Sequence, residues 1–279
     1  MKKWHMIIDV ERCEDCNCCF MACKDEHCDN DFAGYSQRQS KHGHRWINIS
    51  RKERGSGSLT DVFYMPVPCM HCNDPRCAAK AKNSAITKRG DGIVLIDPEK
   101  ARGQRELVGA CPYGAIFWNE EMNVPQKCTF CAHLIDEKWK APRCVQACPT
   151  GALRAVWVEE EEFRIMIDKE GLQVYKPDLR TDPNVFYKNL DLFTKAFIAG
   201  SVAKRVDGIS DCVEGALVTL SKDAKTIRDL VTDNYGDFKF DGLGENSGTY
   251  VIAIKAEKFE EKTIEVRLTE SIYLGDIYL

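Results

Sequence analysis

The sequence lacks long apolar runs and an excess of positive charge. None of its apolar stretches approaches the roughly 20 residues needed to span a bilayer, and the short segment MKKWHMIIDV before Cys13 leaves no room for a secretory signal and its cleavage site. The formal net charge is −4, so the chain has no basic field to neutralise a phosphate backbone. We therefore expect no direct membrane insertion, no nucleic-acid partner and a cytoplasmic location, although a partner with its own signal would still permit export.

Cysteine is nearly absent from the last part of the chain. Only Cys212 follows Cys148, whereas the other fourteen of the fifteen cysteines lie between Cys13 and Cys148. A disulfide scaffold and metal ligation are the two explanations of such a content. Most of these cysteines are two or three residues apart, which places them poorly for pairing with one another. The pattern therefore indicates metal-binding thiolates.

The cysteine spacing is that of bacterial ferredoxins. In the segment CEDCNCCFMAC the order C-x2-C-x2-C-x3-C gives three thiolates to one cubane and the last thiolate to another. Structural zinc sites also use C-x2-C pairs, but the endings CPYGA at Cys111 and CPTGA at Cys148 belong to the ferredoxin pattern. The sequence thus predicts iron–sulfur clusters rather than zinc.

An internal repeat lacks the ligands of one cluster. Residues 7–23 align with residues 95–111, but three of the four cysteines are missing from the second copy, and the motif that begins at Cys69 lacks its last cysteine. The replaced positions are Ala81, Ala101, Gln104 and Leu107. Because each motif of a two-cluster ferredoxin gives its last cysteine to the other cluster, these four positions would surround a single cubane, which we infer has been lost. The alternative is scattered drift, with another cluster incomplete or of the three-iron kind.

The same crossing rule sorts twelve cysteines into three complete [4Fe-4S] sites. The predicted sets are Cys13, Cys16, Cys19 and Cys148 (cluster 1), Cys23, Cys128, Cys131 and Cys144 (cluster 2), and Cys69, Cys72, Cys77 and Cys111 (cluster 3). Cys18 would replace Cys19 only by breaking the spacing. Cys28 and Cys212 have no place in the scheme, and we expect both to be small buried hydrophobes.

The first part of the chain predicts a duplicated ferredoxin-like fold of the α+β class. The apolar segments HMIIDV and GIVLID each lead into a cysteine-motif loop and a short helical stretch. The segment 35–60 is too long for a simple turn. Its His42, His44, Arg45 and Trp46 either contact a partner or a cluster, or belong to a solvated loop with one packed tryptophan.

The rest of the chain changes in character. The segment EEEEFRIMIDKEGL, from Glu159, predicts a helix with an acidic first turn, and residues 175–191 predict an extended linker broken by two prolines. Beyond about residue 199, apolar and polar residues alternate in GALVTL, FKFDGL, TYVIAIKA and KTIEVRL, which is typical of a small antiparallel β-sandwich. No catalytic constellation stands out there, so a docking module and a stabilising appendage both fit.

The four-motif layout resembles the iron–sulfur electron-transfer subunits of the dimethyl sulfoxide reductase family of molybdopterin enzymes. The C-x2-C-x4-C run at Cys69 and the long-spaced motif from Cys128 to Cys148 carry this resemblance. The segments GHRWINI, PCMHC, DGIVLIDPEK, FWNEE and QKCTFCAHL are similar to a version with one cluster fewer, found in transhydroxylases of polyhydroxylated aromatics. CPTGA at Cys148 departs from that version and follows the general family pattern.

The resemblance implies two domains and a catalytic partner. Residues 1–195 would form a polyferredoxin-like domain with three clusters and insertions, and residues 196–279 an immunoglobulin- or transthyretin-like sandwich. A large subunit would hold a molybdenum or tungsten bis-pterin guanine dinucleotide and the active site, in a heterodimer or a higher oligomer. The present chain would contribute no catalytic residue and would pass single electrons.

Three functions are compatible with these features. The first is electron transfer within a molybdopterin enzyme that acts on polyhydroxylated aromatics. The second is electron transfer in a reductase, such as a catechol dehydroxylase or an oxyanion reductase. The third is a free polyferredoxin carrier, which would need neither the long insertion nor the extra domain.

Overall fold

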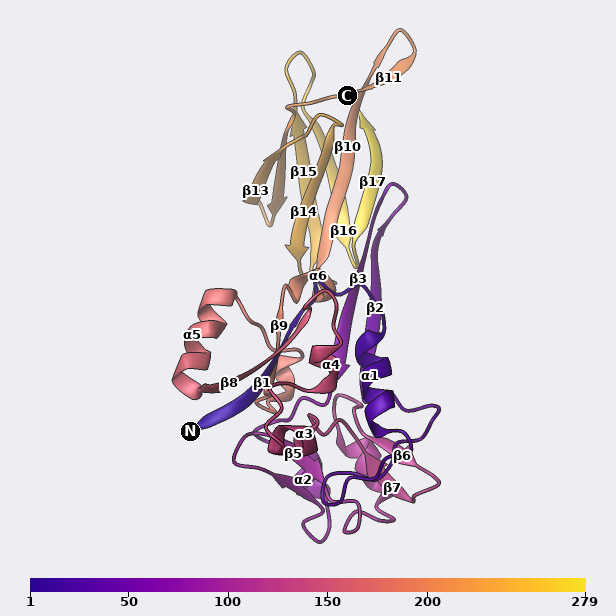
Figure 1. Ribbon diagram of the computed structural model, residues 1–279. Coiled ribbons are helices and arrows are strands. Elements are labelled where there is room, and N and C mark those ends of the chain that lie inside the picture. The colour runs from indigo at the N-terminus through magenta and orange to yellow at the C-terminus, as the bar shows by residue number, and fades with distance from the viewer. The chain divides into compact units, whose positions relative to one another are not determined.

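The first strand of the chain is the middle strand of a three-stranded sheet. The computed structural model describes all 279 residues, and Figure 1 labels its elements. The order in this sheet is β8 (Leu153–Glu159), β1 (Lys2–Asp9) and β9 (Val185–Lys188), with β8 antiparallel and β9 parallel to β1. The prediction of an extended linker over 175–191 is therefore wrong in part. A buried middle strand needs main-chain partners on both edges, and β9 supplies the second.

Short helices and ribbons hold the cysteine motifs. The helical segments are α1 (Cys18–His27), α2 (Arg76–Lys80), the 3-10 turn η1 (Arg105–Ala110), α3 (Ala132–Asp136) and α4 (Arg143–Gln146). Two antiparallel ribbons pair β4 (Ile86–Lys88) with β5 (Val94–Ile96), and β6 (Phe117–Asn119) with β7 (Val124–Gln126). The segments HMIIDV and GIVLID thus form strands, as predicted.

A helix after β8 covers one face of the first sheet. The predicted acidic helix is α5 (Glu160–Glu170), which ends where Gly171 takes the left-handed conformation at φ +63°. Its Phe163 stacks on His5 with ring centroids 3.6 Å apart. Burial, followed by the nearby charge of Lys3, lowers the pKa of His5 from 6.5 to about 4. A short 3-10 turn, η2 (Pro177–Leu179), precedes β9.

The insertion between the first two motifs contains a long β-hairpin. Its strands are β2 (Ile47–Ser56) and β3 (Leu59–Pro68). Gly55 and Gly57 at the turn have φ +84° and +62°, a conformation that glycine adopts without steric cost. The expectation of a solvated loop is wrong for this part, whereas the packed tryptophan is confirmed because Trp46 is only 1% exposed.

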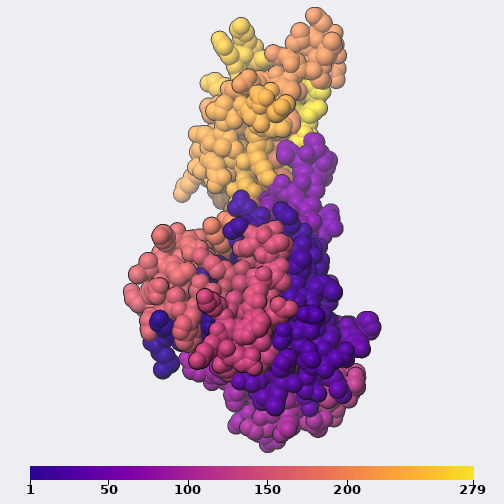
Figure 2. Space-filling view, in the orientation of Figure 1, coloured from indigo at the N-terminus to yellow at the C-terminus, as the bar shows by residue number.

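The chain divides into two compact units. The first comprises residues 1–51 and 64–190, and the second comprises residues 52–63 and 191–279. The tip of the hairpin therefore belongs to the second unit, as the purple surface beside the orange and yellow surface shows in Figure 2. The division lies between residues 190 and 191, compared with 195 and 196 expected from the sequence. No helix is long and apolar enough to cross a membrane.

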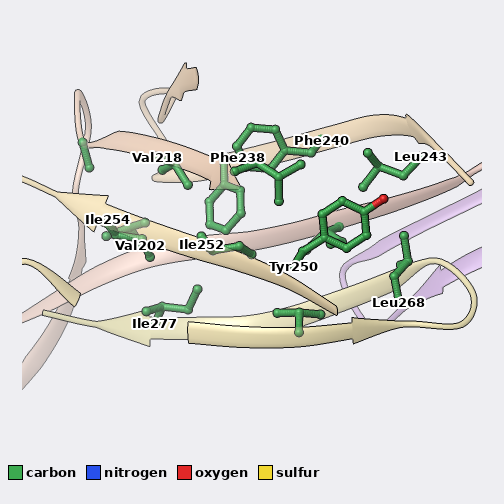
Figure 3. Packing of buried hydrophobic residues seen from close by; sticks show 14 of the residues in the cluster. Val202, Val218, Phe238, Phe240, Leu243, Tyr250, Ile252, Ile254, Leu268 and Ile277 are labelled. Carbon is green, nitrogen blue, oxygen red and sulfur yellow. The ribbon is translucent and has the colours of Figure 1, made fainter. Parts of the chain in front are cut away.

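Two sheets share one apolar core in the second unit, which begins with the short helix α6 (Asp191–Thr194). In one sheet β10 (Ala196–Val206) pairs with β11 (Ile209–Cys212), β14 (Asp237–Leu243) and β17 (Ile272–Tyr278). The other has the order β13 (Lys225–Val231), β12 (Leu217–Lys222), β15 (Gly248–Lys255) and β16 (Lys262–Leu268). Figure 3 shows side chains of both sheets meeting in this core, among them Phe240 and Ile252.

Two features of this unit differ from the prediction. The pair β10 and β17 is parallel, where a wholly antiparallel sandwich was expected. Cys212 is exposed rather than buried, because β11 is an edge strand whose four residues all face solvent. Local alternation reveals a strand but does not say which strand will be its neighbour.

A buried arginine joins the hairpin tip to the sandwich within the second unit. The side chain of Arg54 is fully buried and forms a bidentate pair with Asp241 at 2.9 and 2.8 Å. It also donates to Asp61 at 2.9 Å and to the carbonyl of Lys195 at 3.2 Å. A buried ion pair that loses one partner leaves an uncompensated charge. Arg54 is therefore important for the stability of the second unit.

Arg54→Met is expected to destabilise the second unit by about 2 kcal/mol, since the carboxylates of Asp61 and Asp241 lose charge-assisted hydrogen bonds and keep only Lys239 as a cationic partner. The measurement is hydrogen exchange of peptides from β14, followed by mass spectrometry. A matched control is Lys204→Met, which breaks the more exposed pair with Asp211 at 3.3 Å and should cost about 1 kcal/mol or less. Equal exchange rates in the two variants would contradict the structural role of Arg54.

His5→Phe is expected to reduce the acid sensitivity of the first unit. The pKa of His5 is about 4 in the folded chain against 6.5 ordinarily, so protonation favours the unfolded chain and stability is lost as pH falls below 6.5. Between pH 7.5 and 5.5 this loss is about 1.4 kcal/mol in the wild type and absent from the variant. Calorimetric unfolding at both pH values measures it. His42→Gln, at an exposed histidine, should lose as much as the wild type, and a variant His5→Phe that did so would refute the assignment.

Candidate iron-sulfur centres

Four cysteines from three segments surround one apolar cavity in the first unit. Cys23 lies in α1, Cys128 and Cys131 come directly before α3, and Cys144 lies in α4. These are the cysteines predicted for cluster 2. The cavity contains about 330 Å³ of empty space, including any part open to solvent. Its other lining residues are mostly apolar: His27, Trp46, Ile47, Pro68, Thr129, Phe130 and Pro142.

A second cavity is surrounded by the cysteines predicted for cluster 3. Cys69 and Cys72 follow β3, Cys77 lies in α2, and Cys111 follows η1. About 370 Å³ of empty space lies between them, again including any part open to solvent. The remaining lining is Met70, Pro75, Arg76, Val94, Pro112, Tyr113, Ile116, Lys127 and Thr181. Each cavity thus has four sulfurs from segments far apart in the sequence.

The cysteines predicted for cluster 1 are also close neighbours. Burial, followed by smaller contributions from the nearby Cys13, Cys148 and Cys16, raises the pKa of Cys19 to about 12. Cys16 is exposed, so this set lies at the surface of the first unit. Cys18 lies against Cys16, and its pKa is raised by their hydrogen bond.

The thiols fit a cationic metal cluster by their chemistry. Burial raises the pKa of Cys72 and Cys131 to about 12 and that of Cys144 well above its usual range. A thiolate in such surroundings is unfavourable unless a cation neutralises it, and metal binding releases the thiol proton. No set of three side chains converges as the ligands of a single ion would; the sulfurs of clusters 2 and 3 are instead arranged around the two cavities.

Backbone amides point at the sulfurs from the motif loops. His71 and Phe130, the residues inside two of the C-x2-C loops, have left-handed φ values of +43° and +57°. This conformation turns the chain around the cavity, and hydrogen bonds to sulfur tune the potential of a bound cluster. The amide-to-sulfur bonds run from His71 to Cys69 at 3.5 Å, from Ala115 to Cys111 at 3.5 Å and from Phe130 to Cys128 at 3.4 Å.

The four positions that the sequence assigns to a missing cluster lie in one closed region. Ala101 and Leu107 are fully buried in an apolar group against which Ala81 packs. Gln104, 6% exposed, bonds both main-chain groups of Lys82: its Oε1 accepts from the amide at 2.9 Å, and its Nε2 donates to the carbonyl at 3.2 Å. Side chains and hydrogen bonds therefore occupy the place that the crossing rule gives to a fourth cubane.

The long insertion contributes to the surroundings of the cysteines. Trp46 lines the cluster 2 cavity. Arg45 stacks on Phe20, with 4.2 Å between its guanidinium carbon and the ring centroid, and bonds Asn17 in the first cysteine motif. His44 bonds the carbonyl of Trp118 at 2.8 Å, whereas His42 is exposed.

Sequence reasoning missed some residues at the centres and misplaced another. His71 and Lys127 are buried beside the cysteines, and the only local signal was that each adjoins a ligand position. Cys28 was expected to be buried but is half-buried, and its thiol lies 3.9 Å from the carbonyl of Ser40. It belongs to none of the three sets.

Comparisons with known proteins agree with the cysteine pattern. A family model described as a 4Fe-4S dicluster domain matches residues 60–157. The chain is 45% identical to the pyrogallol hydroxytransferase small subunit of Pelobacter acidigallici over 282 residues, covering 100% of both chains. It is 32% identical over 196 residues to a subunit of the tetrathionate reductase of Salmonella typhimurium, covering 68% of this chain and 73% of the relative.

A third relative is named as an electron-transfer protein. The thiosulfate reductase electron transfer subunit PhsB of Salmonella typhi is 31% identical over 172 residues, which cover 61% of this chain and 83% of the relative. The first of the three relatives matches the whole chain, whereas the other two match only part of it.

Cys111→Ser is expected to lower the iron content of the purified chain by about four atoms, because cluster 3 would lose its only predicted ligand outside the segment 69–77. Iron analysis with parallel electron paramagnetic resonance spectra measures this loss. The matched controls are Cys28→Ser and Cys212→Ser, which should keep all their iron. Loss of iron from either control, or its retention in Cys111→Ser, would contradict the ligand sets.

Proposed function

Because the chain belongs to the iron–sulfur subunits of the dimethyl sulfoxide reductase family, we propose that it carries electrons for a heterodimeric molybdopterin enzyme acting on polyhydroxylated aromatics. The observation that carries this proposal is the 45% identity over the full length of both chains to the pyrogallol hydroxytransferase small subunit. The catalytic site would lie in a large partner subunit holding a molybdenum or tungsten bis-pterin guanine dinucleotide. We propose a cytoplasmic location for the complex.

Three [4Fe-4S] clusters are proposed as the working groups of this chain. Cluster 1 would be held by Cys13, Cys16, Cys19 and Cys148, cluster 2 by Cys23, Cys128, Cys131 and Cys144, and cluster 3 by Cys69, Cys72, Cys77 and Cys111. Two cavities with four cysteines each support clusters 2 and 3. Cluster 1 is supported by the proximity of its cysteines, which raise one another's pKa. When bound, such clusters accept and release single electrons.

The occupied fourth site favours a transhydroxylase over a reductase. Transfer of a hydroxyl group between aromatics is redox-neutral overall, so no electron has to leave the complex. A reductase must draw electrons from an external carrier. Each cluster between that carrier and the active site shortens the distance that an electron crosses in one step. Ala101 and Leu107 close the place of one such cluster, which fits a chain that does not exchange electrons with an external carrier.

The second unit is proposed to be an immunoglobulin- or transthyretin-like sandwich that stabilises the complex or docks a partner. Its two sheets with a common core support the sandwich. Its core contains aliphatic and aromatic side chains. The first unit is proposed to be a duplicated ferredoxin-like fold, since its motifs pair through the crossing rule.

The test is to purify the native complex without oxygen and to measure iron, sulfide, zinc, molybdenum and tungsten per mole of this chain. About 12 irons are expected from three cubanes, after subtraction of any cluster in the partner, with about one molybdenum or tungsten. Turnover of pyrogallol should require no added electron donor.

Other outcomes would favour the other functions. A strict requirement for an electron donor would indicate a reductase. Iron without molybdenum or tungsten, together with a chain that elutes alone in gel filtration of native extract, would indicate a free polyferredoxin carrier. Zinc in place of iron would overturn the assignment of every cysteine.

A further inference from the structure

A buried lysine lies beside the cluster 3 cavity. Lys127 is only 3% exposed and directly precedes Cys128. Its ammonium group donates to the carbonyl of Val94 and to that of Cys128, the latter at 3.0 Å. Both acceptors are uncharged, and a lysine ammonium has a third proton to donate. A buried cation is unfavourable unless a nearby anion compensates it.

The place of Lys127 is fixed by main-chain contacts. The amide of Val94 donates to Nδ1 of His71 at 3.0 Å, so Val94 is held on one side by His71 and on the other by Lys127. The carbonyl of His71 in turn accepts from Asn184 at 2.7 Å. These bonds keep the ammonium at the wall of the cluster 3 cavity rather than in solvent.

Lys127 lies beside ligands of two clusters. Its ammonium group donates to the carbonyl of Cys128, a predicted ligand of cluster 2, at 3.0 Å. Lys127 lines the cavity together with all four cysteines of cluster 3, and Cys128 belongs to cluster 2. Arg76 also lines the cluster 3 cavity but is exposed, so Lys127 is the buried cation among the residues that line the two cavities.

We propose that Lys127 is the fixed counter-charge of cluster 3, and through Cys128 also of cluster 2, and that it raises their reduction potentials. This proposal rests on the three clusters of the proposed function. A cubane with four thiolates is anionic, and uptake of one electron adds one negative charge without forming or breaking a bond. A fixed cation therefore stabilises the reduced cluster more than the oxidised one. Lys127 is a positioning residue and takes no part in substrate chemistry.

The test compares charge-removing and charge-keeping variants in the native complex. Lys127→Met removes the charge and the hydrogen bonds, Lys127→Gln removes the charge but keeps a donor, and Lys127→Arg keeps the charge. Lys169→Met is the matched control at an exposed lysine in α5. Each complex is first analysed for iron and is then titrated with reductant under electron paramagnetic resonance.

Removal of the charge should make cluster 3 harder to reduce. In Lys127→Met and Lys127→Gln the ratio of reduced to oxidised cluster at a fixed potential should fall at least tenfold, which is a shift of about 59 mV for one electron. Cluster 2 should shift in the same direction. Lys127→Arg and Lys169→Met should stay near the wild type.

Two results would overturn the role of Lys127 while leaving the clusters in place. One is full iron content with unchanged potentials in Lys127→Met and Lys127→Gln. The other is a wild-type potential in Lys127→Gln alone, which would assign the effect to hydrogen bonding. Should the Lys127→Met complex fail to assemble, the reduction potentials of Lys127→Gln and Lys127→Arg still show whether the charge has the proposed effect. Absence of cluster 3 from the wild type would instead overturn the three-cluster proposal, and this one with it.

Discussion

Buried thiols are the constraint on which the first unit depends. Thiolates in apolar surroundings are unfavourable unless cations neutralise them, and this unit encloses two cavities with four cysteines each. Its longest helix, α5, has 11 residues, so its helices are too short to be stable alone. The loops between them adopt left-handed turns that wrap the cavities. With the proposed clusters bound, metal ligation and folding would be one event.

The structure brings two of the predicted groups of cysteines together around cavities, whereas it departs from the sequence prediction in several strands. Ligand spacing is set by the size of a cubane, so a motif carries its geometry locally, and the crossing rule joins motifs that are distant along the chain. The strand β9 and the parallel pairing of β10 with β17 depend instead on which segments meet in the folded chain. The exposure of Cys212 has the same origin, since an edge position is decided by neighbours. In the sequence, only Gly55 and Gly57 mark the tip of the hairpin.

The four positions assigned to a missing cubane act as a unit. Deleting a cubane leaves a hole in a close-packed interior, and such a hole is costly unless side chains refill it. Leu107 and two alanines supply the apolar filling. A buried glutamine without hydrogen-bond partners would be destabilising. Gln104 forms hydrogen bonds with the amide and the carbonyl of Lys82, as the main chain of a neighbouring strand would. The sequence identified these positions by their missing cysteines, yet only the structure shows why a polar residue is tolerated among them.

The second unit is discontinuous, and this affects how such chains can gain or lose it. A gene shortened to end at Leu190 would still encode residues 52–63, whose Arg54 would then have lost Asp241. The orphaned guanidinium would also lose the ring of Phe197, whose centroid lies 5.3 Å from its central carbon. Adding or removing the carboxy-terminal segment would therefore require a matching change in the hairpin more than a hundred residues upstream. In this protein the second unit is encoded by two separate stretches of sequence rather than one.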